Sequence, residues 1–246
     1  MCSVTSALKL NVVCEERKIV RILALETSCK PGGIALLEDA TLVCEVELPE
    51  ETGPGRSLAP LIDARLRAAD WAAADLDLVT CTIGPGSFTG LRIGVTTAKT
   101  LAYAAGSQIL GIPTLDVVAE QAPDAITTLT TVIDAQRGEL FSARYDRGTD
   151  QRWQAAGEPQ IVDQAVWLSQ LSVPSWVSGS GLRRPLAGEL PAGLQVVAAT
   201  QWEPRAATVA KIALRRYQAG QRDDFWQLTP RYYRKSAAEE KWESQQ

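Results

Sequence analysis

The residues best suited to chemistry lie in a glycine-rich stretch at 84–94. The apolar, β-branched residues before it predict a buried strand, and the residues after it predict a helix. Gly84 and Gly86 permit a tight turn, and Ser87 is placed to cap the helix. A strand, a glycine turn and a helix in this order can hold a phosphate on the free amides of the helix N-terminus. The same geometry also arises where a strand simply leads into a helix, so both interpretations stay open.

A stripe of small residues runs along the predicted helix. Gly90, Gly94, Ala98 and Ala102 recur every four residues and therefore share one face. Each interior glycine costs a helix about 1 kcal/mol relative to alanine, which indicates that another backbone comes close to this face. That backbone belongs either to the protein's own sheet or to a second helix or partner chain. We predict a partner interface formed by this stripe and Arg92.

The composition of the 246-residue chain excludes several classes of function. The absence of histidine excludes a Ser-His-Asp or Cys-His centre and an H-E-x-x-H zinc protease. The five cysteines show no C-x-x-C spacing, as expected of reduced thiols in a cytoplasmic protein. The net charge of -4 argues against a main role in gripping nucleic acid, so RNA contact should be local or supplied by a partner. No apolar run reaches the ~20 residues of a membrane span, and we expect no membrane contact.

Hydrophobic periodicity predicts two halves that open in the same way. Each begins with a strand that ends in an acidic residue, Glu26 or Asp134, followed by a polar turn and another strand. This weak repeat is typical of a duplicated α/β fold. We place a flexible N-terminal extension at 1–18, a first lobe at 19–116, and a second lobe with the C-terminal helix and tail at 117–246. The predicted strands are 19–26, 33–37, 42–46, 76–83, 108–112, 127–134, 139–145, 153–161 and 175–178, and the predicted helices are 57–71 with Pro60 in its first turn, 89–105, 116–122, 163–171 and 206–218.

Two groups of charged residues allow more than one interpretation. The basic residues near the C-terminal end are Lys211, Arg215, Arg216, Arg231, Arg234 and Lys235. They form either solvated surface or contacts for RNA or a partner. Asp116 and Glu120 lie four residues apart on a predicted helix, where they are either ordinary surface carboxylates or ligands for a hard cation.

Five segments of the sequence resemble the TsaB (YeaZ) family. They are residues 22–28, 84–94, 111–115, 133–139 and 230–234, and the match runs from about residue 20 to 234. The glycine motif at 84–94 is highly specific. The resemblance implies the duplicated, actin-like two-lobed α/β fold of sugar kinases and heat-shock ATPases. It also implies a non-catalytic scaffold or dimerisation subunit that docks on a TsaD-like subunit, in the complex that makes threonylcarbamoyladenosine beside the tRNA anticodon.

The same resemblance implies the partners and the state of the cleft. A TsaE-like ATPase and tRNA are reached through the complex, and the chain dimerises with itself when the TsaD-like subunit is absent. No cofactor is required and no metal site remains, because the segment that carries metal-binding histidines in catalytic relatives has none at 114–120 here. Glu26 and Pro31 also depart from a working phosphate loop. The remnants of a phosphate cleft, with at most weak nucleotide binding, are Thr27, Ser28, Gly84, Gly86, Ser87 and Asp134. The alternatives are an active ATPase or kinase, with Thr27, Ser28, Ser87 and Asp134 around phosphates and magnesium, and a glycopeptidase.

Overall fold

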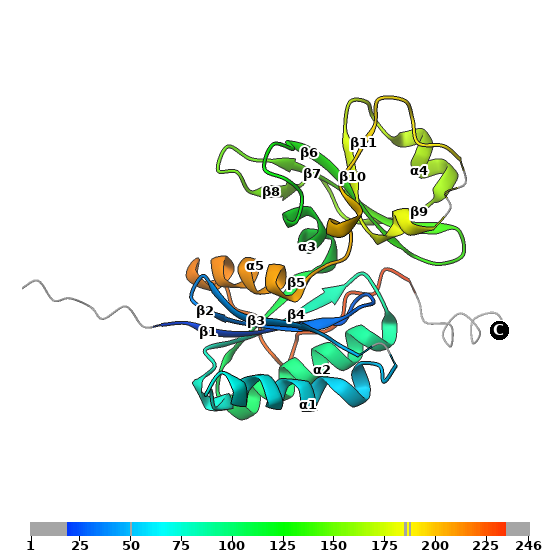
Figure 1. The fold of residues 1–246 in the computed structure, drawn as a ribbon. Helices are drawn as coiled ribbons and strands as arrows, with labels where there is room; N and C mark the ends of the chain where they lie inside the picture. Colours follow the sequence, from blue (N-terminus) through cyan, green and yellow to red (C-terminus); the bar gives the residue numbers. More distant parts are fainter. Residues whose placement is uncertain (1–18, 50, 185, 187, 235–246) are drawn as a thin grey trace, which may run out of the picture.

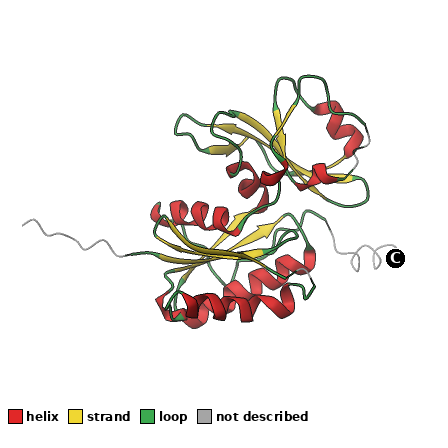
Figure 2. Cartoon of the chain, in the orientation of Figure 1, coloured by secondary structure: helices red, strands yellow, loops and turns green. Residues whose placement is uncertain are grey.

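A computed structural model describes residues 19–49, 51–184, 186 and 188–234, which form two lobes with one β-sheet each (Figures 1 and 2). The predicted extension at 1–18 and Lys235 lie outside these residues. The first sheet is built around β1 (Arg21–Glu26), in which residues 22–25 are completely buried. Such an apolar run is expected of a central strand that is covered on both faces.

The first sheet has the strand order β3-β2-β1-β4-β5. β1 pairs in parallel with β4 and antiparallel with β2, so two parallel strands lie on one side of β1 and a hairpin meander on the other. The remaining strands are β2 (Gly33–Glu38), β3 (Thr41–Glu47), β4 (Leu78–Gly84) and β5 (Gln108–Pro113). The carboxyl ends of the parallel strands β1, β4 and β5 therefore meet at one edge of the sheet.

Helices cover both faces of this sheet, with α1 (Pro54–Ala68) and α2 (Phe88–Ala105) on one face and α5 (Ala206–Gln218) on the other (Figure 1). α5 packs Val209 and Ala213 into one core cluster with Ile22 of β1. Its assignment to the second lobe, which followed sequence order, therefore does not match its packing, because its apolar face covers β1 and β2. No helix within the described residues combines the length and hydropathy needed to cross a bilayer.

The second sheet repeats the topology of the first. β6 pairs antiparallel with β7 and in parallel with β10, as β1 does with β2 and β4, and β10 pairs in parallel with β11. β8 and β9 both pair antiparallel with β7, in the place of β3. The strands are β6 (Thr128–Asp134), β7 (Glu139–Arg147), β8 (Trp153–Ala155), β9 (Gln160–Asp163), β10 (Trp176–Ser178) and β11 (Gln195–Val196). This repetition confirms the predicted duplicated, actin-like α/β fold.

Short helices complete the structure around the second sheet. α3 (Thr114–Glu120) adds Leu115 and Ala119 to the core on one face of the sheet, and α4 (Gln164–Gln170) adds Trp167 to the core on the other. The 3-10 helices are η1 (Ala73–Asp75), η2 (Ser180–Arg183) and η3 (Ala199–Gln201). Each sheet is thus a central layer with helical cover.

Two predicted elements differ from the structure. α1 begins at Pro54, since a proline at the first helical position lacks only an N–H that has no helical partner anyway. Pro60 therefore lies inside α1 and not in its first turn as predicted. The single strand predicted at 153–161 is divided into β8 and β9, because Gly157 and Pro159 interrupt the strand pairing.

Charged side chains connect the lobes where α3 meets α5. Arg216 Nη2 donates to Asp116 Oδ2 at 2.7 Å, and Arg215 Nη1 donates to Glu120 Oε1 at 2.5 Å. The Tyr145 hydroxyl on β7 also donates to Asp116 Oδ1, at 2.9 Å. Asp116 and Glu120 are thus neither free surface carboxylates nor free cation ligands. Among the described residues, no group of three or more His, Cys, Asp or Glu side chains is placed to hold a metal ion.

Candidate functional site

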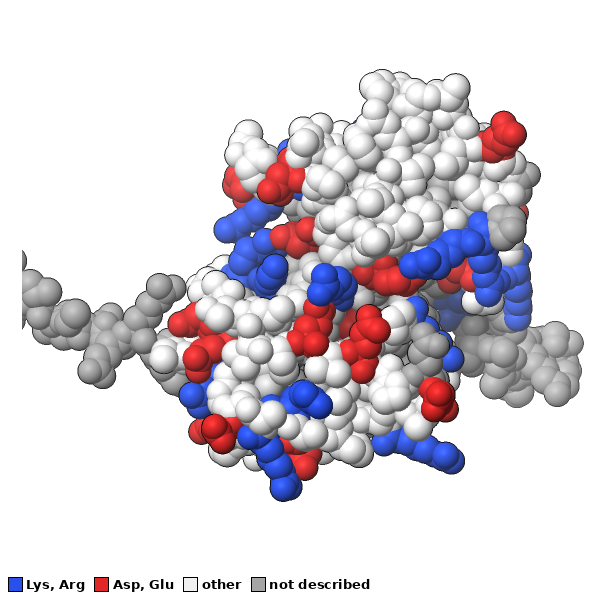
Figure 3. All heavy atoms as spheres, viewed as in Figure 1, with Lys and Arg blue, Asp and Glu red and all other residues white. Residues whose placement is uncertain are grey.

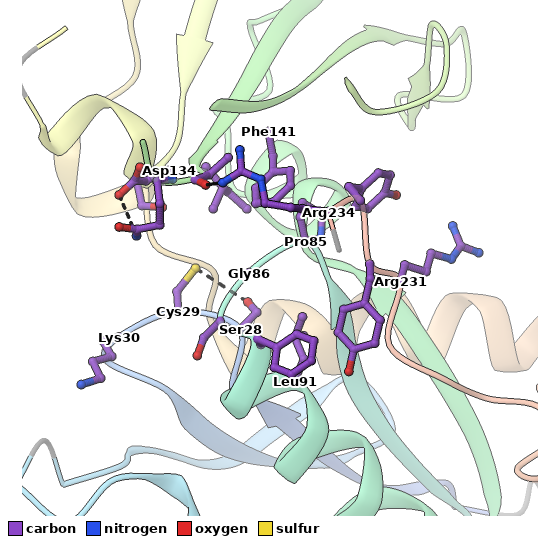
Figure 4. A pocket seen from close by; sticks show the side chains of 18 of the residues that line it. Ser28, Cys29, Lys30, Pro85, Gly86, Leu91, Asp134, Phe141, Arg231 and Arg234 are labelled. Atoms are coloured by element: carbon purple, nitrogen blue, oxygen red, sulfur yellow. Dashed lines mark hydrogen bonds between the residues drawn. The ribbon is translucent and has the colours of Figure 1, made fainter. Parts of the chain in front are cut away.

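A cavity of about 1030 Å³ lies between the two lobes (Figure 4). Its first-lobe wall is the turn after β1, at 28–30, and the turn that leads from β4 into α2, at 85–88. Its second-lobe wall includes residues 133–136 at the end of β6, together with η2. The tail residues 231–234 complete the lining. The cavity thus forms where the ends of β1, β4 and β6 face one another, and its volume is that of a ligand site.

The glycine turn packs against the turn that follows β1. The Ser87 amide donates to the Ser28 carbonyl oxygen at 2.7 Å. A Cβ atom on Gly86 would lie 2.4 Å from the same oxygen, and Gly86 has a φ of 154°. The glycine is therefore required for the close approach of two backbone turns. The amide of Ser87, which a phosphate could have used, is already occupied.

Ser87 also confirms its predicted role as the cap of α2. Its Oγ accepts a hydrogen bond from the Gly90 amide at 3.2 Å, and its carbonyl oxygen accepts from the Leu91 amide at 2.8 Å. These contacts satisfy two of the amides that begin the helix. At this position the helix start is completed by the protein's own atoms.

The small-residue stripe of α2 lies inside the first lobe. A Cβ atom on Gly90 would lie 2.0 Å from the Thr27 carbonyl oxygen, and one on Gly94 would lie 2.1 Å from Thr27 Oγ1. Ala98 and Ala102 are completely or almost completely buried in the core of the same lobe. The backbone that approaches the stripe is therefore the protein's own chain just after β1. The prediction that these four small residues form a partner interface is wrong, because they are not at the surface.

The buried carboxylate of Glu26 accepts hydrogen bonds from the turn that follows β1. The residue is 1% exposed, and its Oε1 accepts from the Ser28 amide and the Ser28 hydroxyl, both at 2.6 Å, and from the Cys29 amide at 3.2 Å. Burial raises the pKa of Glu26 to about 7, against the opposing effect of the hydrogen bonds from Ser28. Its Oε2 has no hydrogen-bond partner among the described residues. Glu26 therefore shapes the turn, and the Ser28 hydroxyl is engaged in the same contact.

The structure brings some of the predicted phosphate-cleft residues to the cavity and leaves others behind its wall. Ser28, Gly86, Ser87 and Asp134 line the cavity. Thr27 and Gly84 are buried and do not line it.

Asp134 does not offer a free carboxylate to the cavity. Its Oδ1 accepts from the Gln136 amide at 2.8 Å, and its Oδ2 lies 2.9 Å from Arg184 Nε. Ser28, Ser87 and Asp134, which would bind phosphate in an active cleft, thus make hydrogen bonds or an ion pair within the protein.

The sequence did not indicate that basic and aromatic side chains gather at one cavity. Arg92, predicted only as part of a partner interface, stands over the Phe88 ring at 4.0 Å and donates from Nε to the Tyr232 hydroxyl at 3.0 Å. The other residues of these types that line the cavity are Lys30, Phe141, Arg183, Arg184, Arg231, Tyr233 and Arg234. Of these, Arg231, Tyr233 and Arg234 lie in the family segment 230–234, and Arg231 and Arg234 also belong to the basic cluster noted in the sequence. Lys30, Phe141, Arg183 and Arg184 come from separate segments with no shared motif.

Comparison with known proteins identifies the family. The model of the family described as "TsaD: tRNA N6-adenosine threonylcarbamoyltransferase" matches residues 55–180. The Bacillus subtilis (strain 168) tRNA threonylcarbamoyladenosine biosynthesis protein TsaB is 29% identical over 227 residues, covering 90% of this chain and 97% of that protein. The Escherichia coli (strain K12) protein of the same name is 33% identical over 170 residues, covering 66% of this chain and 72% of its own length. The chain belongs to the TsaB (YeaZ) family.

Solved structures support the TsaB-family fold. YeaZ from Pseudomonas aeruginosa superposes on 87% of this chain and 99% of its own, with a TM-score of 0.70 and 21% sequence identity. A crystal structure described as an uncharacterized protein with similarity to peptidase YEAZ, from the same organism, superposes with a TM-score of 0.72 and 23% identity. It covers 87% of this chain and all of that chain. The two-lobed arrangement is thus shared with YeaZ.

Proposed function

We propose that this chain is an accessory subunit in the biosynthesis of tRNA threonylcarbamoyladenosine and acts by docking on a TsaD-like catalytic subunit. The observation that carries the proposal is the match to a TsaB protein over 90% of this chain and 97% of the relative. The match to the TsaD family model supports a partner of the same fold. This role places the protein in the cytoplasm, together with its tRNA.

The subunit performs no chemistry of its own. Its sequence contains no histidine, so it offers no imidazole as a base or as a metal ligand. The Ser87 amide and the Ser28 hydroxyl are both bonded within the chain, which leaves few groups to bind a transferring phosphate. The role requires no cofactor, and a TsaE-like ATPase and tRNA join through the TsaD-like subunit.

The outward face of α2 is the surface that we assign to the partner, since the small-residue stripe faces inward. Tyr103 on this helix is 67% exposed, and its ring lies 5.9 Å from that of Trp226, which is 73% exposed. Exposed aromatic side chains of this kind often supply the main binding energy of an interface. In the absence of the TsaD-like subunit, two copies of the chain pair through this face.

Reconstitution with the TsaD-like subunit of the same organism tests the proposal. The two proteins should elute together in gel filtration, and omission of this chain should abolish threonylcarbamoyladenosine in tRNA, measured by mass spectrometry of digested tRNA. Modification at an undiminished rate without the chain would refute the accessory role. The chain alone should not turn over labelled ATP, and steady turnover that is lost in Asp134→Ala would favour the ATPase alternative.

A further inference from the structure

The interlobe cavity has a charge opposite to that of the whole protein. The chain carries a net charge of -4, whereas the described residues that line the cavity include six basic ones and two acidic ones, Asp134 and Glu203. The basic residues are Lys30, Arg92, Arg183, Arg184, Arg231 and Arg234. In Figure 3, Lys and Arg side chains gather on the right-hand side at the level where the lobes meet. This concentration of positive charge in an acidic protein points to an anionic ligand.

Three of these six cations form no ion pair with another described residue. Arg183 pairs with Glu203, Arg184 with Asp134, and Arg234 with Glu139. None of the ion pairs between described residues includes Lys30, Arg92 or Arg231. All three of these residues are exposed. They are therefore available to a ligand at the mouth of the cavity.

The side chain of Arg92 is fixed by contacts with two aromatic residues. Its guanidinium lies 4.0 Å from the centroid of the Phe88 ring, and its Nε donates to the Tyr232 hydroxyl. The Phe88 and Tyr232 rings are themselves 4.7 Å apart. The terminal nitrogens of a guanidinium fixed in this way suit the oxygens of a phosphate. The two rings beside it offer a surface on which a nucleobase can stack.

The placement of the free cations favours an extended polyanion over a small phosphate ligand. Lys30 and Arg231 lie at opposite sides of the pocket (Figure 4). A single phosphate buried at the glycine turn would need the amide of Ser87, which the Ser28 carbonyl occupies. Cations spread along a rim, next to aromatic rings, are typical of proteins that bind single-stranded nucleic acid.

We propose that the mouth of the interlobe cavity binds a single-stranded segment of RNA. Lys30, Arg92 and Arg231 contact backbone phosphates, and the rings of Phe88 and Tyr232 stack on a base. The inference rests on the proposed function, because tRNA is the substrate of the modification in which we place the chain. It assigns the chain a direct contact with the RNA in addition to its docking role.

The test compares two triple variants of the full chain with the same change in net charge. The first carries Lys30→Gln, Arg92→Gln and Arg231→Gln. The matched control neutralises three exposed cations away from the cavity, with Arg56→Gln, Arg67→Gln and Arg152→Gln. Binding to tRNA and to a short single-stranded RNA is measured by fluorescence anisotropy at several salt concentrations. Circular dichroism checks that each variant is folded. The single variant Lys30→Gln, which changes one exposed side chain, tests RNA binding if the triple variant does not fold.

The cavity variant should bind both RNAs at least tenfold more weakly than the wild type, and the control should differ from the wild type less than about twofold. Each phosphate contact to a single strand contributes about 0.7 to the salt slope, so the loss of three should lower it by about 2. Equal losses in the two triple variants would overturn the proposal. ATP or a poly-glutamate peptide that binds the cavity as tightly as RNA would also overturn it.

A reconstituted modification assay separates this inference from the proposed function. If the wild-type chain supports threonylcarbamoyladenosine formation and the cavity variant does so with an unchanged KM for tRNA, the RNA contact is refuted and the accessory role stands. If the wild-type chain does not support the modification, the proposed function itself fails. The expected result is a raised KM for tRNA in the cavity variant and an unchanged KM in the control.

Discussion

Substitution of Gly90 by alanine gives the sharpest test of how α2 packs in the first lobe. Alanine in place of glycine stabilises a helix by up to about 1 kcal/mol when space is available. At Gly90, however, the distance from the new Cβ to the Thr27 carbonyl oxygen must grow from 2.0 Å to at least 3.0 Å. Overpacking of a core costs typically about 1–3 kcal/mol and occasionally more. We expect Gly90→Ala to lower the free energy of unfolding by about 2 kcal/mol, or the melting temperature by about 4–8 °C for a chain of this size.

Gly55→Ala is the matched control. Gly55 also lies in the first turn of a helix, α1, and its added Cβ would meet only Ile93 Cδ1, at 3.5 Å, which is an ordinary contact. This variant should melt at the wild-type temperature or slightly above it. Thermal melting followed by circular dichroism measures both. A Gly90→Ala protein as stable as Gly55→Ala would refute the close packing of α2 on the chain after β1.

A second variant pair identifies the atoms that clash. The Cβ added at Gly94 meets the Thr27 side chain, whereas the one added at Gly90 meets the Thr27 backbone. Thr27→Ala removes Oγ1 and Cγ2, and should therefore relieve much of the destabilisation by Gly94→Ala, with a coupling free energy of about 1–2 kcal/mol. The same Thr27→Ala change should leave the destabilisation by Gly90→Ala unaltered. Equal relief in both double variants would contradict the geometry.

Substitutions at three other residues test further contacts of the fold. Because the pKa of Glu26 is raised from 4.5 to about 7 in the folded protein, the free energy of unfolding should fall as pH rises through this window, and in urea titrations Glu26→Gln should reduce that fall; equal slopes would contradict the assignment. Tyr145→Phe removes the 2.9 Å hydrogen bond to Asp116 and should cost about 1–2 kcal/mol, so an unchanged urea midpoint would show that the contact does not form. Ser87→Ala should cost about 1 kcal/mol in thermal melts by loss of the helix cap, whereas Ser87→Asp, which keeps an acceptor, should melt above it.

Local sequence was sufficient for most of the helices and strands. The apolar run of β1 and the cap at Ser87 act through neighbouring residues, so their patterns predict the structure directly. The two acidic-ended strands also predicted the duplication, which the matching strand orders of the two sheets confirm. The position of α5 was not predictable in this way. Its apolar face is compatible with either sheet, and only the complete packing decides which one it covers.

The cavity depended on tertiary structure. Arg92 and Tyr232 are 140 residues apart in the chain, and no local pattern connects them. The free cations of the cavity mouth likewise come from the turn after β1, from α2 and from the tail. Such residues acquire a common role only when the two lobes and the tail meet.

The small-residue stripe of α2 shows what the sequence determined and what the tertiary structure decided. The glycines at 90 and 94 indicate from sequence alone that another part of a protein chain packs closely on α2, because close packing compensates their cost in a helix. Whether this part belongs to the same chain or to a partner is not encoded in the spacing, since internal and external contacts require the same small side chains. The position of Thr27, about 2 Å from where each added Cβ would lie, decided that the contact is internal.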